Sequence, residues 1–141
     1  MLFCYLGMEF IRRLEERLKG ELPGRSAQVE MSAVPTNGGH FVQRENGRNA
    51  GVLSLFFPNK GEWSLALIRR AFHEKDHHSR QISFPGGSFE AKDVTFEQTA
   101  LREEEEEIKV VQSKVKVIVE LSNVYIPVSN FNVFPSVAYT E

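Results

Sequence analysis

The sequence predicts a single layered domain of the α/β or α+β class, in which strands surround one long helix. A dense apolar run at 52–57, a Pro-Asn-Lys-Gly turn and a second apolar stretch at 63–68 together indicate a β-hairpin. No helix breaker occurs between 95 and 108, which predicts the longest helix of the core. Alternating apolar residues at 115–121 and 132–139 predict two further strands, so we expect helix and sheet to pack in layers.

The N-terminal third divides into a helix and a connection. From Met8 to Lys19 apolar residues recur at helical spacing, and Gly20 closes a predicted helix over 8–20. Residues 22–49 are rich in Pro, Gly, Ser and Asn and predict an irregular connection. The chain has 141 residues, which suits one domain, so we expect 1–141 to form a single unit with its core in 50–141.

Between the hairpin and the long helix the sequence predicts a loop and a short strand. Residues 69–80 are charged and rich in histidine, which favours a loop, and 81–84 form a short strand that runs into Pro85-Gly86-Gly87. Thr95, followed three residues later by Gln98, is typical of a capping box and marks the start of the helix.

Composition narrows the classes of function. Hydrophobic residues make up 41% and charged residues 26% of the chain, which is typical of a globular domain. A net charge of −2 gives no basic field, so we expect neither nucleic acid nor membrane as a partner. The apolar N-terminal stretch lacks the features of a signal peptide, and the lone Cys4 cannot form an internal disulfide, so we expect a cytoplasmic location.

The chemistry is concentrated in a run of glutamates on the predicted helix. Glu103, Glu106 and Glu107 stand at i, i+3 and i+4, so their carboxylates share one face. Crowded carboxylates repel one another unless a cation neutralises them, and such hard oxygen ligands suit Mg²⁺ or Mn²⁺. The Gly86-Gly87 turn allows backbone to approach the same place. Taken alone, a glutamate run is more often a solvated face.

The combination of glycine turn and glutamate helix resembles the Nudix box, G-x5-E-x7-R-E-U-x-E-E-x-G-U, where U is aliphatic. The spacing from Asp93 to Arg102 is one residue longer than in the general pattern, and this length with aspartate is similar to the coenzyme A pyrophosphatase branch. The matching positions are Gly87, Asp93, Arg102, Glu103, Glu106, Glu107 and Val110.

Three further segments resemble that branch. Residues 78–87 resemble its H-x-G-Q-[VI]-S-F-P-G-G signature, 99–103 match T-A-L-R-E, and 125–131 are similar to a segment after the helix. The resemblance covers roughly 50–139 and implies the Nudix α/β/α sandwich with a mixed sheet. It implies hydrolysis of the diphosphate of coenzyme A, or of a related nucleotide-linked compound, to 3′,5′-ADP and 4′-phosphopantetheine in the presence of Mg²⁺ or Mn²⁺.

The resemblance also implies a role for each matching residue. Glu103, Glu106 and Glu107 would bind the metal with the carbonyl of Gly87, and Arg102 belongs to the catalytic set by pairing with an acidic residue of the loop. Asp93 would cap or brace that loop. Simpler roles stay open for several residues. Arg102 also suits a surface salt bridge, His78 a solvated loop, and Arg69 or Arg70 a plain surface position. The implied substrate-binding residues are Arg70, His78, Gln81, Ser83, Phe84 and Gly86.

The sequence departs from the pattern at three positions. Lys109 and Arg80 stand where glycines are expected, and lysine in a left-handed conformation costs about 1 kcal/mol. Glu104 occupies an aliphatic position that should pack against the sheet, where an unpaired carboxylate is expensive. Two interpretations remain: a weakened or re-specialised hydrolase, and a non-catalytic binding or regulatory domain with the same fold.

The end of the sequence suggests an incomplete sandwich. A strand at 133–139 enters the second half of the predicted fold, and the sequence stops at Glu141. We expect an uncovered sheet edge or apolar surface there, covered by a homodimer or exposed in a poorly stable monomer.

Overall fold

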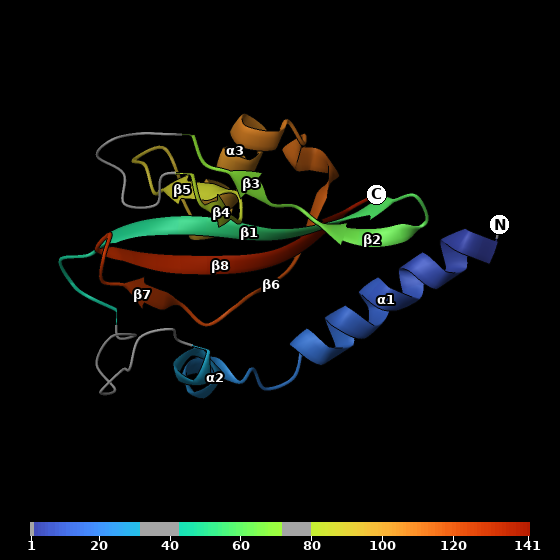
Figure 1. Ribbon diagram of the computed structural model, residues 1–141, viewed down its shortest axis with the longest axis horizontal. Helices are drawn as coiled ribbons and strands as arrows, with labels where there is room; N and C mark the ends of the chain where they lie inside the picture. The colour runs from blue at the N-terminus through green and yellow to red at the C-terminus, as the bar shows by residue number, and fades with distance from the viewer. Residues whose placement is uncertain (1, 32–42, 72–79) are drawn as a thin grey trace.

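A computed structural model describes residues 2–31, 43–71 and 80–141 of the chain. Its centre is a mixed sheet built on β1 (Arg48–Asn59) and β8 (Phe131–Thr140), which run parallel over nine register pairs (Figure 1). β2 (Glu62–Leu65) and β5 (Gly86–Ser88) pair antiparallel with β1, while β6 (Val115–Glu120) and β7 (Val124–Ile126) pair antiparallel with β8. Two short strands, β3 (Ile68–Arg69) and β4 (Ile82–Ser83), form a separate pair.

One face of the sheet is covered by α3 (Phe96–Ile108) (Figure 1). Gly51 of β1 allows close packing, because a Cβ atom there would lie 2.2 Å from the carbonyl oxygen of Phe96. The apolar core forms below the helix, and its fully buried members are Leu53, Leu55, Ala66, Ala100 and Ala138. The helix that carries the glutamates is therefore held firmly against the sheet.

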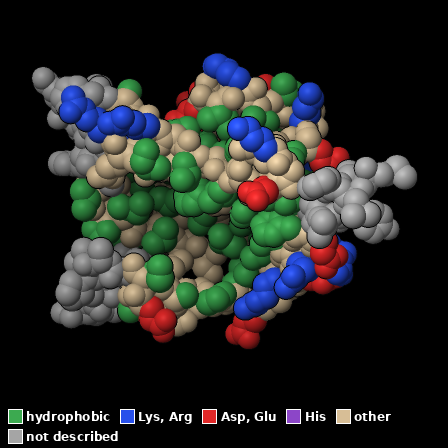
Figure 2. Space-filling view, turned by 45° about the vertical axis from the view of Figure 1, so that its right-hand side comes forward, with side chains coloured by type: hydrophobic (Ala, Val, Ile, Leu, Met, Phe, Trp, Pro, Cys, Tyr) green, Lys and Arg blue, Asp and Glu red, His purple; other side chains and the backbone are tan. Residues whose placement is uncertain are grey.

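The other face lies toward α1 (Leu2–Leu18) and α2 (Gly24–Glu30) (Figure 1). Phe10 of α1 contacts Phe56 and Trp63, with ring centroids 5.4 and 6.1 Å apart, and Ile11 is almost completely buried. By contrast, α2 buries none of its residues. Hydrophobic side chains gather in a hollow at the middle of the face shown in Figure 2, with charged side chains around it.

The predicted elements are largely confirmed, with shifted bounds. The hairpin, the long helix and the last two predicted strands are present as β1–β2, α3, β6 and β8. The N-terminal helix begins at Leu2, earlier than predicted, and α2 lies inside the stretch that we expected to be irregular. α2 escaped sequence reasoning because it begins at Pro23-Gly24 and has no buried stripe, so it lacks apolar periodicity.

The last strand does not leave an open edge. β8 is paired on both sides, by β1 and by β6 and β7, so the uncovered-edge part of our expectation is wrong. An apolar surface is nevertheless present beside the C-terminus, where Leu67 is 51% exposed and lies in a groove with Phe57 and Val110. Within the described residues, no helix is long and apolar enough to cross a membrane.

Candidate active site

The start of α3 is fixed by the capping box that the sequence predicts. Thr95 is in extended conformation, and its hydroxyl accepts a hydrogen bond from the backbone N–H of Gln98 at 3.1 Å. The Gln98 side chain in turn accepts from the N–H of Val94 at 2.9 Å. These bonds satisfy backbone donors that a helix start leaves unpaired, and they set the rotation of the helix. The glutamates two turns later take their direction from this start.

Arg102 and Asp93 bind the loop before the helix to the helix itself. The Arg102 guanidinium donates from Nε and Nη2 to the two carboxylate oxygens of Asp93, both at 3.1 Å, and a further bond reaches the carbonyl of Ser88. Asp93 also accepts from the Thr99 hydroxyl and from the N–H of Glu90. Because Arg102 donates to it, the pKa of Asp93 lies well below its usual range. Both side chains are largely buried, so this is a bracing pair.

Glu103 and Glu107 approach the glycine turn from the helix. A Cβ atom on Gly87 would lie 2.4 Å from the Glu103 carboxyl carbon, so any other residue there would displace that carboxylate. The N–H of Gly86 donates to Glu107 Oε2 at 3.0 Å. Burial raises the pKa of Glu107, and the neighbouring Glu103 raises it further, against the lowering effect of the Gly86 bond. The turn and the two carboxylates thus form one crowded, negatively charged corner.

Glu106 lies apart from this corner. Its side chain is 58% exposed, and its Oε1 lies 3.5 Å from Arg102 Nη1. Within residues 2–31, 43–71 and 80–141, no three His, Cys, Asp or Glu side chains stand close enough together to hold a metal ion. The structure therefore brings two of the three predicted carboxylate ligands together, and Arg102 pairs with the third and with Glu103 at 2.7 Å.

The corner opens into a pocket of about 810 Å³. The predicted substrate-binding residues that line it are Arg70, Gln81, Ser83, Phe84 and Gly86. Arg69, the alternative to Arg70, is exposed on β3 and is absent from the lining. His78 lies outside the described residues, so its predicted contact stays a prediction. The Ser83 hydroxyl is buried and finds no hydrogen-bond partner in the part of the chain described, so a bound ligand would relieve a cost there.

Sequence reasoning missed the far wall of this pocket. It is formed by the first residues of β1 and by the segment from β7 to β8, namely Arg48, Ala50, Val52, Ile126, Val128, Phe131 and Val133. The parallel pairing of β1 with β8 brings these segments together from positions about eighty residues apart. Nothing local in the sequence signals that pairing, although the segment 125–131 already resembled the coenzyme A branch.

Two of the three departures from the family pattern lie in left-handed backbone. Arg80 and Lys109 both have φ of 63°, which glycine adopts without strain and other residues adopt at a cost. The glycines of the pattern are therefore explained by conformation, and both replacements are strained. Lys109 recovers part of this cost, because its ammonium group donates to the carbonyl of Glu106 at 2.7 Å, at the end of the helix.

The third departure, Glu104, is buried as the aliphatic pattern predicts. Its side chain has no exposed surface, and neither carboxylate oxygen has a hydrogen-bond partner among the described residues. Burial raises its pKa to about 7, and the negative charge of Glu107 adds to the effect. Glu104 faces the core between Ala100 and Ile108 and does not line the pocket, so its cost falls on stability.

The donor set of the corner fits a divalent cation. Glu103 and Glu107 supply hard carboxylate oxygens, and Gly87 brings backbone close with no side chain between. Burial raises the pKa of Glu107, and the charge of Glu103 adds to the rise, so a cation there would stabilise the charged carboxylate. Mg²⁺ is commonly bound by one or two carboxylates together with water and substrate phosphates, so two converging carboxylates are sufficient.

Solved structures share this fold. A Nudix hydrolase from M. smegmatis, RenU, superposes with a TM-score of 0.51 at 22% identity over 71% of this chain and 69% of its own. A mutT/nudix family protein from Listeria innocua gives 0.53 at 17% identity over 69% and 67%. The mixed sheet and the helix of this chain therefore form a Nudix fold.

The sequence comparisons establish the family. Residues 46–140, most of the chain, match the NUDIX domain, so this protein belongs to the Nudix family. Enzymes of this family are pyrophosphohydrolases that generally use divalent metal ions and act on small nucleotide-diphosphate compounds. A relative from Photorhabdus laumondii, named as uncharacterized Nudix hydrolase NudL, is 40% identical over 55% of this chain and 41% of its own. The Yersinia pestis NudL is 36% identical over 59% and 40%. The matches thus span about two-fifths of these relatives' length.

Proposed function

We propose that this domain hydrolyses the diphosphate of coenzyme A with Mg²⁺ or Mn²⁺ as its cation. One observation carries the proposal: a single pocket contains the carboxylates of Glu103 and Glu107, the guanidinium of Arg70 and the bare backbone of Gly86 and Gly87. A diphosphate needs positive charge near its oxygens and a cation between itself and the protein carboxylates. Arg70 can provide the first, and Glu103 and Glu107 can hold the second.

The cation would be held by Glu103, Glu107 and the carbonyl of Gly87, with Glu106 as a further ligand from the rim. When bound, it would neutralise phosphate charge and make water a better nucleophile near neutral pH. Asp93 and Arg102 would keep the loop and the helix at a fixed separation, so that the ligands are positioned before substrate arrives. This positioning role is what we propose for Arg102.

The remaining pocket residues would bind the substrate. Arg70 lies close enough to Glu107 to offset part of the rise in the pKa of that carboxyl, and it would donate to diphosphate oxygens next to the cation. Ser83 would satisfy its buried hydroxyl on the substrate, beside Gln81, Phe84 and the Gly86 backbone. His78 is proposed as a further contact from the resemblance.

The reaction is a single displacement at phosphorus. The oxygen of water forms a bond to one phosphorus, and the bridging P–O bond breaks. The bridging oxygen leaves with the other phosphate, and one proton of the water passes to the surroundings. Coenzyme A and water thereby give 3′,5′-ADP and 4′-phosphopantetheine. The choice of coenzyme A is supported by the similarity of 78–87 and 125–131 to that branch of the family.

The direct test is incubation with coenzyme A and Mn²⁺, followed by chromatography of the products. We expect both products from the wild-type protein, none with EDTA, and a loss of at least about 100-fold in Glu107→Gln. Glu97→Gln is the matched control, because Glu97 is an exposed glutamate on the same helix and does not line the pocket. Cleavage of ADP-ribose alone would support diphosphate hydrolysis and exclude coenzyme A as the substrate. No cleavage of coenzyme A, ADP-ribose or any other nucleoside-diphosphate-linked compound would exclude the hydrolase activity.

A second candidate is a nucleotide-binding or regulatory domain without turnover. The strained Lys109 and the buried Glu104 favour it, because both lower the stability of the helix that carries the ligands. Binding of nucleotide by calorimetry, with no product after long incubation at high protein concentration, would select this reading.

We also propose a cytoplasmic homodimer. The lone cysteine is consistent with a reducing compartment, and the apolar groove at Phe57, Leu67 and Val110 offers a surface for a second copy. Multi-angle light scattering of the wild type and of Leu67→Glu tests the dimer. A monomeric wild type excludes it.

A further inference from the structure

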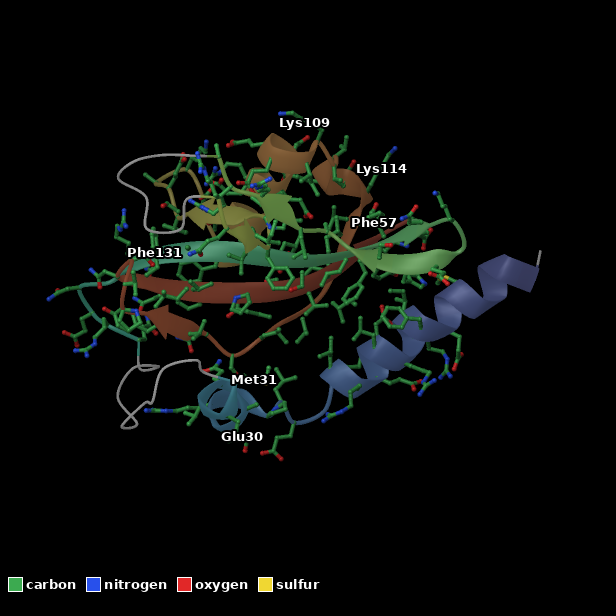
Figure 3. The ribbon with its side chains drawn as sticks, viewed as in Figure 1. Glu30, Met31, Phe57, Lys109, Lys114 and Phe131 are labelled. Carbon is green, nitrogen blue, oxygen red and sulfur yellow. The ribbon has the colours of Figure 1, made fainter. Side chains whose placement is uncertain are left out.

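The pocket has a second charged position, at the end opposite the carboxylates. Arg48 begins β1, and its guanidinium lies over the ring of Phe131, 4.1 Å from the ring centroid. Its Nη2 donates to the carbonyl of Ser129 at 3.1 Å. Phe131, labelled in Figure 3, stands at the start of β8. Ring and carbonyl together fix the direction of an otherwise flexible cation on the pocket wall.

The charge of Arg48 is not neutralised by the part of the chain that the structure describes. No carboxylate of residues 2–31, 43–71 or 80–141 lies within ion-pair distance of it, whereas Arg102 contacts four. The hydrogen bond to Ser129 uses one N–H of a group that has five. Arg48 therefore retains donors for an anionic ligand.

The distance along the strand decides what kind of ligand can reach both ends. Gly51 pairs with Gly87 at the carboxylate corner, and Arg48 is three residues away on the same strand. At the rise of a β-strand, three residues span about 10 Å. A nucleoside carrying phosphate at two positions of its ribose is of this size, so a diphosphate at the corner and a second phosphate at Arg48 can belong to one molecule.

The floor between the two ends is apolar, and Ser88 and Glu90 line the pocket beside it. Alternate residues of paired strands point to one face, so Ala50 and Val52 of β1 lie beside Val133 of β8 on the same side as Arg48 and Phe131. Ala50 and Val133 are largely buried and lie at the floor of the pocket. Such a floor suits the ring of a nucleoside, and the nearby carboxylate of Glu90 is already paired with Lys92 and Arg102.

We propose that Arg48, supported by Phe131, binds the 3′-phosphate of a 3′-phosphorylated adenine nucleotide whose 5′-diphosphate lies at the Glu103–Glu107 corner. This inference rests on the proposed function for the position of the diphosphate. It makes Arg48 the residue that distinguishes coenzyme A from dephospho-coenzyme A, which lacks only that phosphate. Arg70 and Arg48 then bind the two ends of the same nucleotide.

The test compares two ligands that differ by one phosphate. It also compares Arg48, which lines the pocket, with an arginine that does not. Wild type, Arg48→Met, Arg48→Lys and Arg44→Met are titrated calorimetrically, without metal, with 3′,5′-ADP and with 5′-AMP. Arg44 is the matched control, since it also lies over an aromatic ring, that of Tyr125, but does not line the pocket. Loss of one charge-assisted contact is expected to weaken binding roughly 10- to 100-fold in Kd.

We expect Arg48→Met to weaken 3′,5′-ADP by at least about tenfold, Arg48→Lys to restore part of the loss, and 5′-AMP to change by less than about twofold. Arg44→Met should leave both ligands unchanged. If Arg48→Met weakens both ligands equally, Arg48 contacts a part that the two ligands share and not the 3′-phosphate, and the proposal is overturned. The proposal is also overturned if neither affinity changes. Thermal melting of each variant checks that it is folded.

Hydrolysis measured in parallel separates this inference from the proposed function. If the wild type cleaves coenzyme A and dephospho-coenzyme A equally well, and Arg48→Met cleaves both as the wild type does, the 3′-phosphate site is wrong while the hydrolase stands. If nothing is cleaved but 3′,5′-ADP binds in an Arg48-dependent way, the proposed hydrolase activity is excluded and the 3′-phosphate site at Arg48 is supported.

Discussion

Replacing Glu104 by leucine should stabilise the protein, because this carboxylate is fully buried and unpartnered within the described residues. Its pKa rises from 4.5 to about 7, which corresponds to about 3 kcal/mol of lost stability when the group is ionised. Leucine at this position adds apolar contact with Ala100 and Ile108, and the usual residue there is aliphatic. We therefore expect the free energy of unfolding of Glu104→Leu to exceed that of the wild type by about 3 kcal/mol at pH 8.

The pH dependence gives the same prediction a second signature. Between the unfolded pKa of 4.5 and the folded pKa of about 7, the folded chain binds more protons than the unfolded chain. The free energy of unfolding of the wild type therefore falls as pH rises through this window, and levels off above it. Glu104→Leu lacks the group, so the difference between the two proteins should be small at pH 4.5 and largest above pH 7.

Urea denaturation at several pH values between 4.5 and 8.5 measures both effects. The matched control is Glu97→Leu, a change at an exposed position of the same helix, which should shift stability by about 0.5 kcal/mol or less at every pH. A variant that is less stable than wild type at pH 8, or a difference that does not grow with pH, would imply that Glu104 has a partner in the folded protein.

Three further changes test other parts of the structure. Asp93→Asn removes one partner of a buried ion pair and should cost about 3 kcal/mol by urea denaturation; because the pKa of Asp93 is lowered, the wild type should lose this stability as pH falls below about 4. Lys109→Gly relieves left-handed strain and should raise stability by about 1 kcal/mol, whereas a loss would show that its bond to the helix end dominates. Gly87→Ala displaces the Glu103 carboxylate and should lower kcat/KM for coenzyme A about 100-fold, and an unchanged rate would remove Glu103 from the site.

Sequence patterns predicted the elements whose signals are local. The hairpin, α3 and the strands β6 and β8 follow from apolar periodicity, and the capping box at Thr95 marked the helix start to the residue. The family pattern has glycine at the positions of Arg80 and Lys109 because the backbone there is left-handed. The motif shows that glycine is usual at these positions, and only the structure shows why. Buried Glu104 was likewise foreseen, because its position in the pattern is aliphatic.

Long-range pairing could not be predicted from the same signals. The parallel contact between β1 and β8 joins residues far apart in the chain, and it alone brings Arg48 and Phe131 to the pocket. α2 was missed because a short helix with no buried side chain has no apolar stripe. Glu106 shares the helix with Glu103 and Glu107, yet its exposed side chain pairs with Arg102 and does not line the pocket, which helical spacing alone does not reveal.

Thermal melting with and without Mn²⁺ shows whether Glu103 and Glu107 form a divalent-metal site. A cation that binds only the folded chain stabilises it by about 2.7 kcal/mol at one hundred times Kd, which is several degrees for a domain of this size. We predict such a rise for the wild type in millimolar Mn²⁺ and none for the double variant Glu103→Gln, Glu107→Gln. A wild-type melt that shifts no more in Mn²⁺ than in NaCl of equal ionic strength would show that these carboxylates do not bind a divalent metal.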